Sequence, residues 1–319
     1  MAKHTPPRRP KSGAKTRVST EEPVFAQPQP SPDPTTFKNP VTDQNYTEIA
    51  NLEPVPQPVD GAVEPILTLA QTYGSAGEAK VTTIQQAKQI VFHSVGDTGS
   101  VIGPDTQSLV PDKMVSDFDE YFTFDAPFVR ILGLYSNVLE DPGVISSQGG
   151  TNSLDDRRIT FLTTALKRVK SENYTGAVII AVHHPPFTGD STDGGSPQML
   201  ADIDAACTAA VVWPHAVFSG HAHNYQRFTR TVNGIQIPYL VAGCGGHSPL
   251  AAMRGTYRTP YKIDDTLTLE SYDDTDYGYL RVVVNAQTLT IEFHPESDGG
   301  VTKTPDDTVT VNLQTRAIS

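Results

Sequence analysis

The chain has 319 residues, 37% of them hydrophobic and 19% charged, which is enough to bury a substantial core as one large domain or two small ones. The net charge of -12 and the pI of about 5.1 argue against a general attraction to nucleic acids or anionic membranes. No apolar stretch is long enough to span a bilayer, and the N-terminus lacks the hydrophobic centre of a signal peptide, so a cytoplasmic location is the default expectation.

Residues 1–60 are rich in proline, poor in aromatic residues, and open with a basic patch before the first acid, Glu21. Such a segment cannot bury enough apolar surface to offset its ordering entropy. We therefore predict a disordered tail over 1–60 and a folded domain over 61–319. The basic tail leaves one alternative function open, a binding module that captures a partner through this segment.

The first clear strand is 89–95, after an ambiguous region in which 65–72 is a candidate short helix. The strand is followed by Gly96-Asp97-Thr98-Gly99, which places the Asp97 carboxylate at a strand's C-terminal end, where α/β sheets bind ligands. An aspartate in such a turn is more often a simple turn residue. Asp97 is therefore a candidate only in combination with other residues.

Segments 121–125 and 128–135 alternate like the two strands of a hairpin, and 154–170 has the apolar stripe of an amphipathic helix. Ser153 and Asp156 precede that stripe with the spacing of a capping box.

The continuous apolar run 177–182 is typical of a strand buried on both faces, and it ends in His183-His184-Pro185-Pro186. Pro185 forces His184 toward extended geometry. We therefore expect the two rings to point apart, with only one of them reaching a shared site.

A predicted helix over 197–210 leads to a strand and then to Phe218-Ser-Gly-His221-Ala-His223-Asn-Tyr-Gln-Arg227. Two histidines one residue apart project to the same side of an extended backbone. That arrangement suits divalent metals, since neutral imidazole is their commonest side-chain ligand. For an isolated His-x-His, a pair of exposed loop histidines is the competing interpretation.

The C-terminal third predicts antiparallel strands. A hairpin turning at Asn233-Gly234 comes first, then a flexible loop ending in His247, and then an acidic segment over 264–276 that we expect to be a solvated loop. Further strands follow at 278–284, 288–294 and 309–313. Alternating strands and helices followed by hairpins predict a layered α/β sandwich.

Three motifs in this order, Gly-Asp-x-Gly, His-His-Pro-Pro and Gly-His-x-His, resemble the calcineurin-like metallophosphoesterases, and the last looks closest to the purple acid phosphatase branch. The resemblance covers roughly residues 88–297. It implies an α/β fold, a layered metallophosphoesterase-type β-sandwich flanked by helices. It also implies two metal ions, drawn from iron, zinc and manganese, and a phosphate ester substrate.

The resemblance assigns roles to eight residues of this chain. It implies that Asp97 and His223 hold one metal ion, that His183 and His221 belong to the second, that His184 and His247 lie near the substrate, and that Tyr225 and Arg227 support the loop. His247 has a plain turn histidine as its alternative. His93 and His215 fall inside strand patterns and are predicted to be packing residues.

Two motifs of the family are absent: Gly-Asp-x-x-Tyr/Asp, whose aspartate bridges the metals, and Gly-Asn-His-Asp/Glu, which supplies an asparagine ligand and the catalytic histidine. The other Gly-Asp, Gly189-Asp190, is out of order. The sequence therefore resembles a family member with an internal block deleted near 119–121, and we expect an incomplete fold.

The function implied by the resemblance is phosphate ester hydrolysis, in which metal-activated hydroxide attacks phosphorus. The four remaining ligands amount to two per ion, so we expect one ion or none in this chain. The alternative is a catalytically impaired or inactive form that at most binds metal or a partner.

Overall fold

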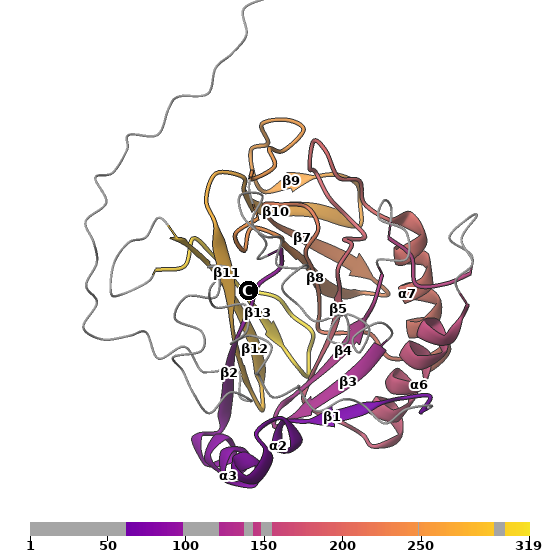
Figure 1. Cartoon of the computed structure of the whole chain (residues 1–319). Coiled ribbons are helices and arrows are strands. Elements are labelled where there is room, and N and C mark those ends of the chain that lie inside the picture. Colours follow the sequence, from indigo (N-terminus) through magenta and orange to yellow (C-terminus); the bar gives the residue numbers. More distant parts are fainter. Residues whose placement is uncertain (1–61, 98–120, 137–142, 148–154, 248, 297–303) are drawn as a thin grey trace, which may run out of the picture.

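The structure is a computed structural model that describes residues 62–97, 121–136, 143–147, 155–247, 249–296 and 304–319. Two β-sheets stack face to face, and two helices cover the outer face of the larger sheet (Figure 1). The tail predicted over 1–60 and residues 98–120, beside the predicted deletion, lie outside the described part of the chain. No described helix is long and apolar enough to cross a membrane.

The larger sheet has nine strands in the order β1-β3-β4-β5-β6-β8-β7-β10-β9. Their bounds are β1 Ile66–Thr68, β3 Tyr121–Ala126, β4 Val129–Leu134, β5 Ala177–Val182, β6 Ala216–Ser219, β8 Ile235–Ala242, β7 Tyr225–Val232, β10 Leu267–Asp273 and β9 Tyr261–Lys262. The central strands β4, β5, β6 and β8 are parallel, so their C-terminal ends meet at one edge. The predicted hairpins β3/β4 and β7/β8 flank this parallel centre.

The smaller sheet has four antiparallel strands: β13 Asp307–Asn312, β12 Thr288–Pro295, β11 Gly278–Asn285 and β2 Gln89–Ser94. All four match predicted strands. Alternate side chains of β11 and β12, such as Val282 and Ile291, pack against Ile179 and Phe218 of the larger sheet. Apolar burial between the two sheets is therefore what holds β2 beside the larger sheet.

Helices α6 (Arg157–Ser171) and α7 (Pro197–Ala210) pack on the opposite face of the larger sheet. Strand β5 supplies both layers: Ile180 faces the helices and Ile179 faces the smaller sheet. This confirms the prediction of a strand buried on both faces. The short elements α2 (Leu69–Thr72), η3 (Gly74–Ala76) and α3 (Gly77–Ala87) lead from β1 to β2.

Three local predictions are wrong or incomplete. The acidic segment predicted as a solvated loop contains β10, because Leu267 and Leu269 are buried while Glu270 and Asp273 are partly exposed. The candidate helix at 65–72 is β1 followed by α2. Helix α6 begins after Asp156, whose carboxylate accepts hydrogen bonds from Ser147 instead of capping the helix.

The result is a mixed α/β architecture with two sheets and few helices, which confirms the predicted layered sandwich.

Candidate metal centre

Asp97 reaches the larger sheet because the chain beyond β2 runs beside the end of β8. Gly96 N donates to Ala242 O at 2.9 Å, and His247 N donates to Asp97 O at 2.8 Å. Asp97 itself has φ 51°, an uncommon conformation for a residue other than glycine. Such strain costs on the order of 1 kcal/mol or more and is concentrated at functional sites, where surrounding contacts hold it in place.

The Asp97 carboxylate lies at the centre of the histidine loops. Its Oδ2 accepts a hydrogen bond from His221 N at 2.7 Å, and its Oδ1 lies 3.9 Å from His183 Nε2 and from His223 Nε2. Gly220 is required here, because a Cβ at that position would stand 2.5 Å from Asp97 Oδ2. Burial raises the pKa of Asp97, and the His221 N–H and the neighbouring histidines oppose that rise.

His184 is fixed by Ser136, at the end of the adjacent parallel strand. Because Leu134 pairs with Val182, the residues two positions further on, Ser136 and His184, also lie side by side. Ser136 Oγ accepts from His184 N at 3.1 Å and lies 2.9 Å from His184 Nδ1. The ring is buried and is therefore held in one orientation.

His183, His184 and His221 form one cluster. His183 Nε2 lies 3.3 Å from His221 Nδ1, and the ring centroids of His184 and His221 are 4.2 Å apart. One ring nitrogen from each of the three lies within 4.8 Å of the others. The expectation that only one of the two adjacent histidines reaches the shared site is therefore wrong: a twist after β5 turns both rings toward His221.

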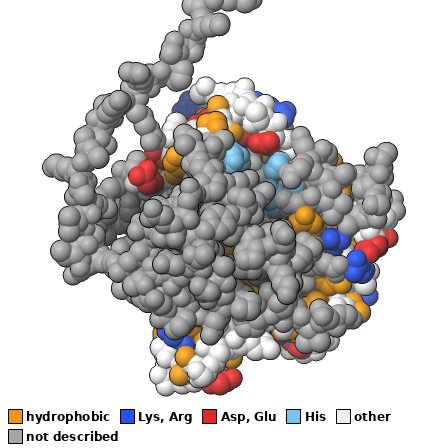
Figure 2. All heavy atoms as spheres, in the orientation of Figure 1, with side chains coloured by type: hydrophobic (Ala, Val, Ile, Leu, Met, Phe, Trp, Pro, Cys, Tyr) orange, Lys and Arg blue, Asp and Glu red, His pale blue; other side chains and the backbone are white. Residues whose placement is uncertain are grey.

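His223 and His247 lie together on the other side of Asp97. Their ring centroids are 4.2 Å apart at an interplanar angle of 40°. His247 Nδ1 is buried and has no hydrogen-bond partner among the described residues. The fold thus brings Asp97, His183, His221 and His223 together, with His184 and His247 beside them. Figure 2 shows histidine side chains at the surface of this face, next to acidic ones.

The protonation state of His183 suits metal binding. Burial, together with His221 and His223 nearby, lowers its pKa to about 4. His183 is therefore neutral at pH 7 and keeps a lone pair for a metal.

Asn224, Tyr225 and Arg227, which follow the two histidines of the motif, anchor the loop to two different acids. Asn224 Nδ2 donates to Asp190 Oδ2 at 3.0 Å. On the other side, Tyr225 Oη donates to Asp307 Oδ2 at 2.6 Å, and Arg227 makes two hydrogen bonds to the same carboxylate. Tyr225 and Arg227 therefore support the loop through the first residue of β13.

A cavity of about 320 Å³ adjoins the site. Gly96, His183 and Gly220 line it at the histidine end. The rest is lined mainly by apolar side chains, such as Phe122, Leu134, Phe218 and Leu280, with Ser94 and Ser219 among them. Its size lies within the range of small-molecule sites.

Residues 237–303 match the family model described as "Iron/zinc purple acid phosphatase-like protein C". The chain is therefore related to purple acid phosphatase-like proteins. This confirms the relationship predicted from the motifs. No curated protein matches the chain.

Two solved structures are among those similar to the chain. One is described as "GAP50 the anchor in the inner membrane complex of Plasmodium": 12% identity, TM-score 0.37, covering 58% of this chain and 52% of that one. The other is described as "Structure of PhoD": 11% identity, TM-score 0.41, covering 62% of this chain and 43% of that one. The chain spans about half the length of these proteins.

The side chains present fit a transition-metal ion. Two nitrogens that bind one zinc ion at 2.0–2.1 Å in tetrahedral geometry are about 3.3 Å apart, which is the separation of His183 Nε2 and His221 Nδ1. His221 Nε2 is buried and lacks a hydrogen bond among the described residues. By contrast, the 3.9 Å between Asp97 Oδ1 and His223 Nε2 must shorten before both could bind one ion.

Sequence reasoning missed three residues of the site: Ser136, Asp193 and Asp307. Asp193 Oδ1 lies 3.9 Å from His221 Nε2. The position of Ser136 beside His184 follows from the pairing of the two strands and could have been predicted. No local sequence pattern indicates that Asp193 and Asp307 lie near the histidines. Of the predicted packing histidines, His215 is buried and bonded to Val178 N and Leu313 O. His93 is exposed, with its ring edge against Tyr279.

Proposed function

We propose that the chain is a metal-dependent phosphoric ester hydrolase whose metal centre includes Asp97, His183, His221 and His223. The observation that carries this proposal is the convergence of these residues from three segments far apart in the sequence: Asp97 Oδ1 lies 3.9 Å from the His183 and His223 rings, and the His183 and His221 rings approach to 3.3 Å. Iron, zinc and manganese are the candidate metals.

Each residue has a physical role in this proposal. His183 presents a neutral ring because its pKa is about 4. Asp97 supplies the negative charge and orients the His221 backbone through a 2.7 Å hydrogen bond. His247 flanks the ligands, where it can contact the substrate phosphate, and the His184 ring lies beside His183 and His221. A bound ion would act as a Lewis acid and lower the pKa of a bound water.

The ester group of the substrate lies in the adjoining cavity. The cavity meets the candidate ligands at His183 and Gly220 and is mainly apolar beyond them, so an ester with an aromatic or aliphatic group can place its phosphate at the histidines. The absent Gly-Asn-His motif removes one clamp on the transition state. The expected turnover is therefore slow, since each such clamp contributes about 3 to 4 kcal/mol.

The test is p-nitrophenyl phosphate turnover by the full chain after loading with zinc, manganese or iron, with metal content measured on the same sample by plasma mass spectrometry. Metal-dependent turnover that disappears in the His221→Ala/His223→Ala double variant supports the proposal. The matched control is His93→Ala, which removes an exposed histidine outside the site.

The second candidate is a protein that binds metal without hydrolysing esters. The sequence favours it in one respect, the absence of both Gly-Asp-x-x-Tyr/Asp and Gly-Asn-His-Asp/Glu. Bound metal with no turnover in any loaded form would reject the hydrolase and favour this candidate.

A further inference from the structure

We infer that His184 is a direct metal ligand in this chain, and that His183, His184 and His221 form a three-histidine site for one zinc-like ion. This inference deepens the proposed function, on which it rests for the presence of a metal. It differs from the pairing implied by the motifs, in which His184 lies beside the ligands and each ion has two protein ligands.

The first observation is the geometry of the cluster. Among the described residues, these three are the only group of histidine, cysteine or acidic side chains whose ligand atoms all lie within 4.8 Å of one another. The closest pair, His183 Nε2 and His221 Nδ1, already has the 3.3 Å separation of two ligands on one tetrahedral ion. Three protein nitrogens would leave a fourth position open, as in catalytic zinc sites.

The second observation concerns the oxygen atoms near the ring nitrogens of His184 and His221 that would not bind the metal. Metal-bound histidines usually donate their other N–H to a nearby oxygen, which fixes the tautomer. His184 Nδ1 lies 2.9 Å from Ser136 Oγ, which leaves Nε2 as the ligating nitrogen. If His221 binds through Nδ1, its Nε2–H points to the Asp193 carboxylate, now 3.9 Å away.

The third observation is how the neighbouring structure holds His184. The ring is buried, and a Cβ on Gly143 would overlap it, so residue 143 must be a glycine for the ring to sit where it does. Ser136 Oγ also accepts from His184 N at 3.1 Å. A ring held by its own backbone, its Nδ1 and a close glycine is preorganised.

The other side of Asp97 is less suited to a first ion. Among the described residues, Asp97, His223 and His247 do not make a second group of three clustered ligand atoms like that of His183, His184 and His221. A single ion therefore occupies the three-histidine position in preference to the one beside His223.

The experiment measures Zn²⁺ affinity and stoichiometry by calorimetry on the full chain, together with the visible spectrum of the Co²⁺-loaded protein. One ion per chain and a tetrahedral Co²⁺ spectrum are expected. His184→Phe, which keeps an aromatic ring in the buried position, should weaken Zn²⁺ binding at least as much as the 10- to 100-fold loss typical of a lost supporting residue. His93→Ala, which removes an exposed histidine outside the site, should leave the affinity within about threefold.

Because His184 is buried, folding of each variant is checked by circular dichroism, and Ser136→Ala provides a second test that removes no ligand. Ser136→Ala should weaken Zn²⁺ binding about 10-fold or more. A folded His184→Phe or Ser136→Ala variant with wild-type affinity would overturn the inference, as would an equal loss in the folded His93→Ala variant. Zinc bound as expected but without ester turnover rejects the proposed hydrolase and leaves this inference intact.

Discussion

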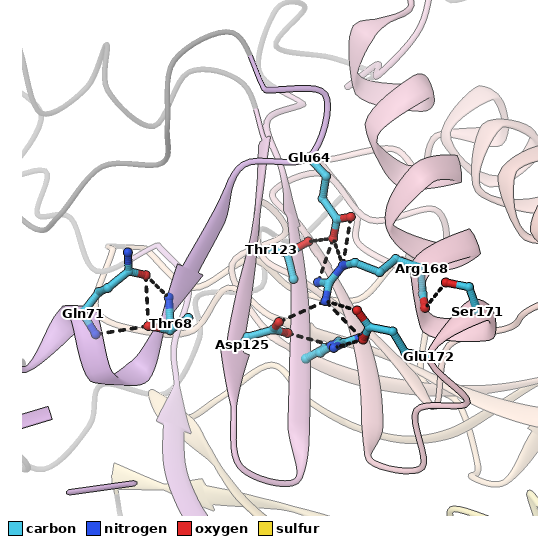
Figure 3. Close-up of polar contacts among 9 residues, drawn as sticks. Glu64, Thr68, Gln71, Thr123, Asp125, Arg168, Ser171 and Glu172 are labelled. Atoms are coloured by element: carbon cyan, nitrogen blue, oxygen red, sulfur yellow. Dashed lines mark hydrogen bonds and ion pairs between the residues drawn. The ribbon is translucent and has the colours of Figure 1, made fainter. Parts of the chain in front are cut away.

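The two ends of the nine-stranded sheet differ in how their polar side chains are paired. At the end where β4 and β5 begin, Arg168 contacts Glu64 at 2.8 Å and Asp125 at 3.1 Å, and Arg130 contacts Asp125 at 2.7 Å and also Glu172 (Figure 3). Each acid there meets at least one arginine. Burial alone would lower the pKa of Arg168, but Glu64 and Asp125 raise it well above its ordinary value.

At the end of the sheet where β5 and β6 finish, the polar side chains are not arranged in pairs of acid and arginine. Histidine lies against histidine: the ring centroids of His183 and His221 are 5.1 Å apart, and those of His184 and His221 are 4.2 Å apart. Asp97 and His221 also have positive φ, at 51° and 65°. Neutral imidazole rings clustered in this way suit a divalent metal ion as their common partner. The arginine network, by contrast, stabilises the fold on its own.

The largest expected effect comes from breaking the arginine network. Arg168→Ala leaves Glu64 and Asp125 with one cation fewer, and we expect the free energy of unfolding to fall by about 3 to 5 kcal/mol. Urea denaturation measures it. Arg157→Ala is the matched control, since the Arg157–Asp155 pair is more than half exposed and should change stability by less than about 1 kcal/mol.

Zinc affinity should distinguish the two ends of the sheet further. Arg168→Ala should leave the affinity of the folded protein unchanged, because the network and the histidines lie at opposite ends of the sheet. A loss of zinc binding in this variant, measured well below its urea midpoint, would show that the two ends are coupled.

Asp307 links fold and site, so its removal should affect both. Asp307→Ala leaves the buried Tyr225 hydroxyl and the Arg227 guanidinium without their shared acceptor, and we expect a loss of about 2 to 4 kcal/mol. Burial alone would raise the pKa of Asp307, yet Arg227 and Tyr225 lower it, so the carboxylate is ionised at neutral pH.

Since β7 begins two residues after His223, the same variant should also loosen the histidine loop and weaken zinc binding. Asp307→Asn, which keeps an acceptor oxygen, should recover part of both losses. Unchanged stability in Asp307→Ala would contradict the anchoring role of this residue.

A smaller effect should appear as pH dependence of the metal-free protein. Burial and the nearby Arg316 lower the pKa of His215 from 6.5 to about 3. Below pH 6.5 His215 binds a proton in the unfolded chain but stays neutral in the folded chain. The free energy of unfolding therefore falls as the pH drops, by about 2 kcal/mol between pH 6.5 and 5.

His183, with a pKa of about 4, should act in the same direction over the same range. Urea midpoints measured at pH 7.5, 6.5, 5.5 and 5 test this prediction. His215→Gln should be less stable at pH 7.5 but show a shallower slope. An identical slope in that variant would assign the pH dependence to other groups.

The motifs predicted the ligands because each lies directly after a strand whose pattern is clear in the sequence. Asp97 after β2, His183 after β5 and His221 after β6 are candidates by the rule that α/β sheets bind ligands at strand ends, and the family resemblance assigned their roles. Strand β10 was missed because Glu270, Asp273 and the acids on either side of the strand concealed the buried pair Leu267 and Leu269.

The orientation of His184 could not be predicted from local sequence. It depends on Ser136, which lies 48 residues earlier, and on the close approach of Gly143. Asp307 likewise meets Tyr225 across 82 residues. Such contacts depend on strand register and packing between distant segments, and a local sequence pattern gives no information about either.

The most direct test of the three-histidine site is X-ray diffraction from zinc-loaded crystals of the full chain, recorded at the zinc absorption edge. The predicted result is one anomalous peak with the ring nitrogens of His183, His184 and His221 about 2.0–2.1 Å away. A peak bound instead by Asp97 and His223, with His184 still turned to Ser136 alone, would contradict it.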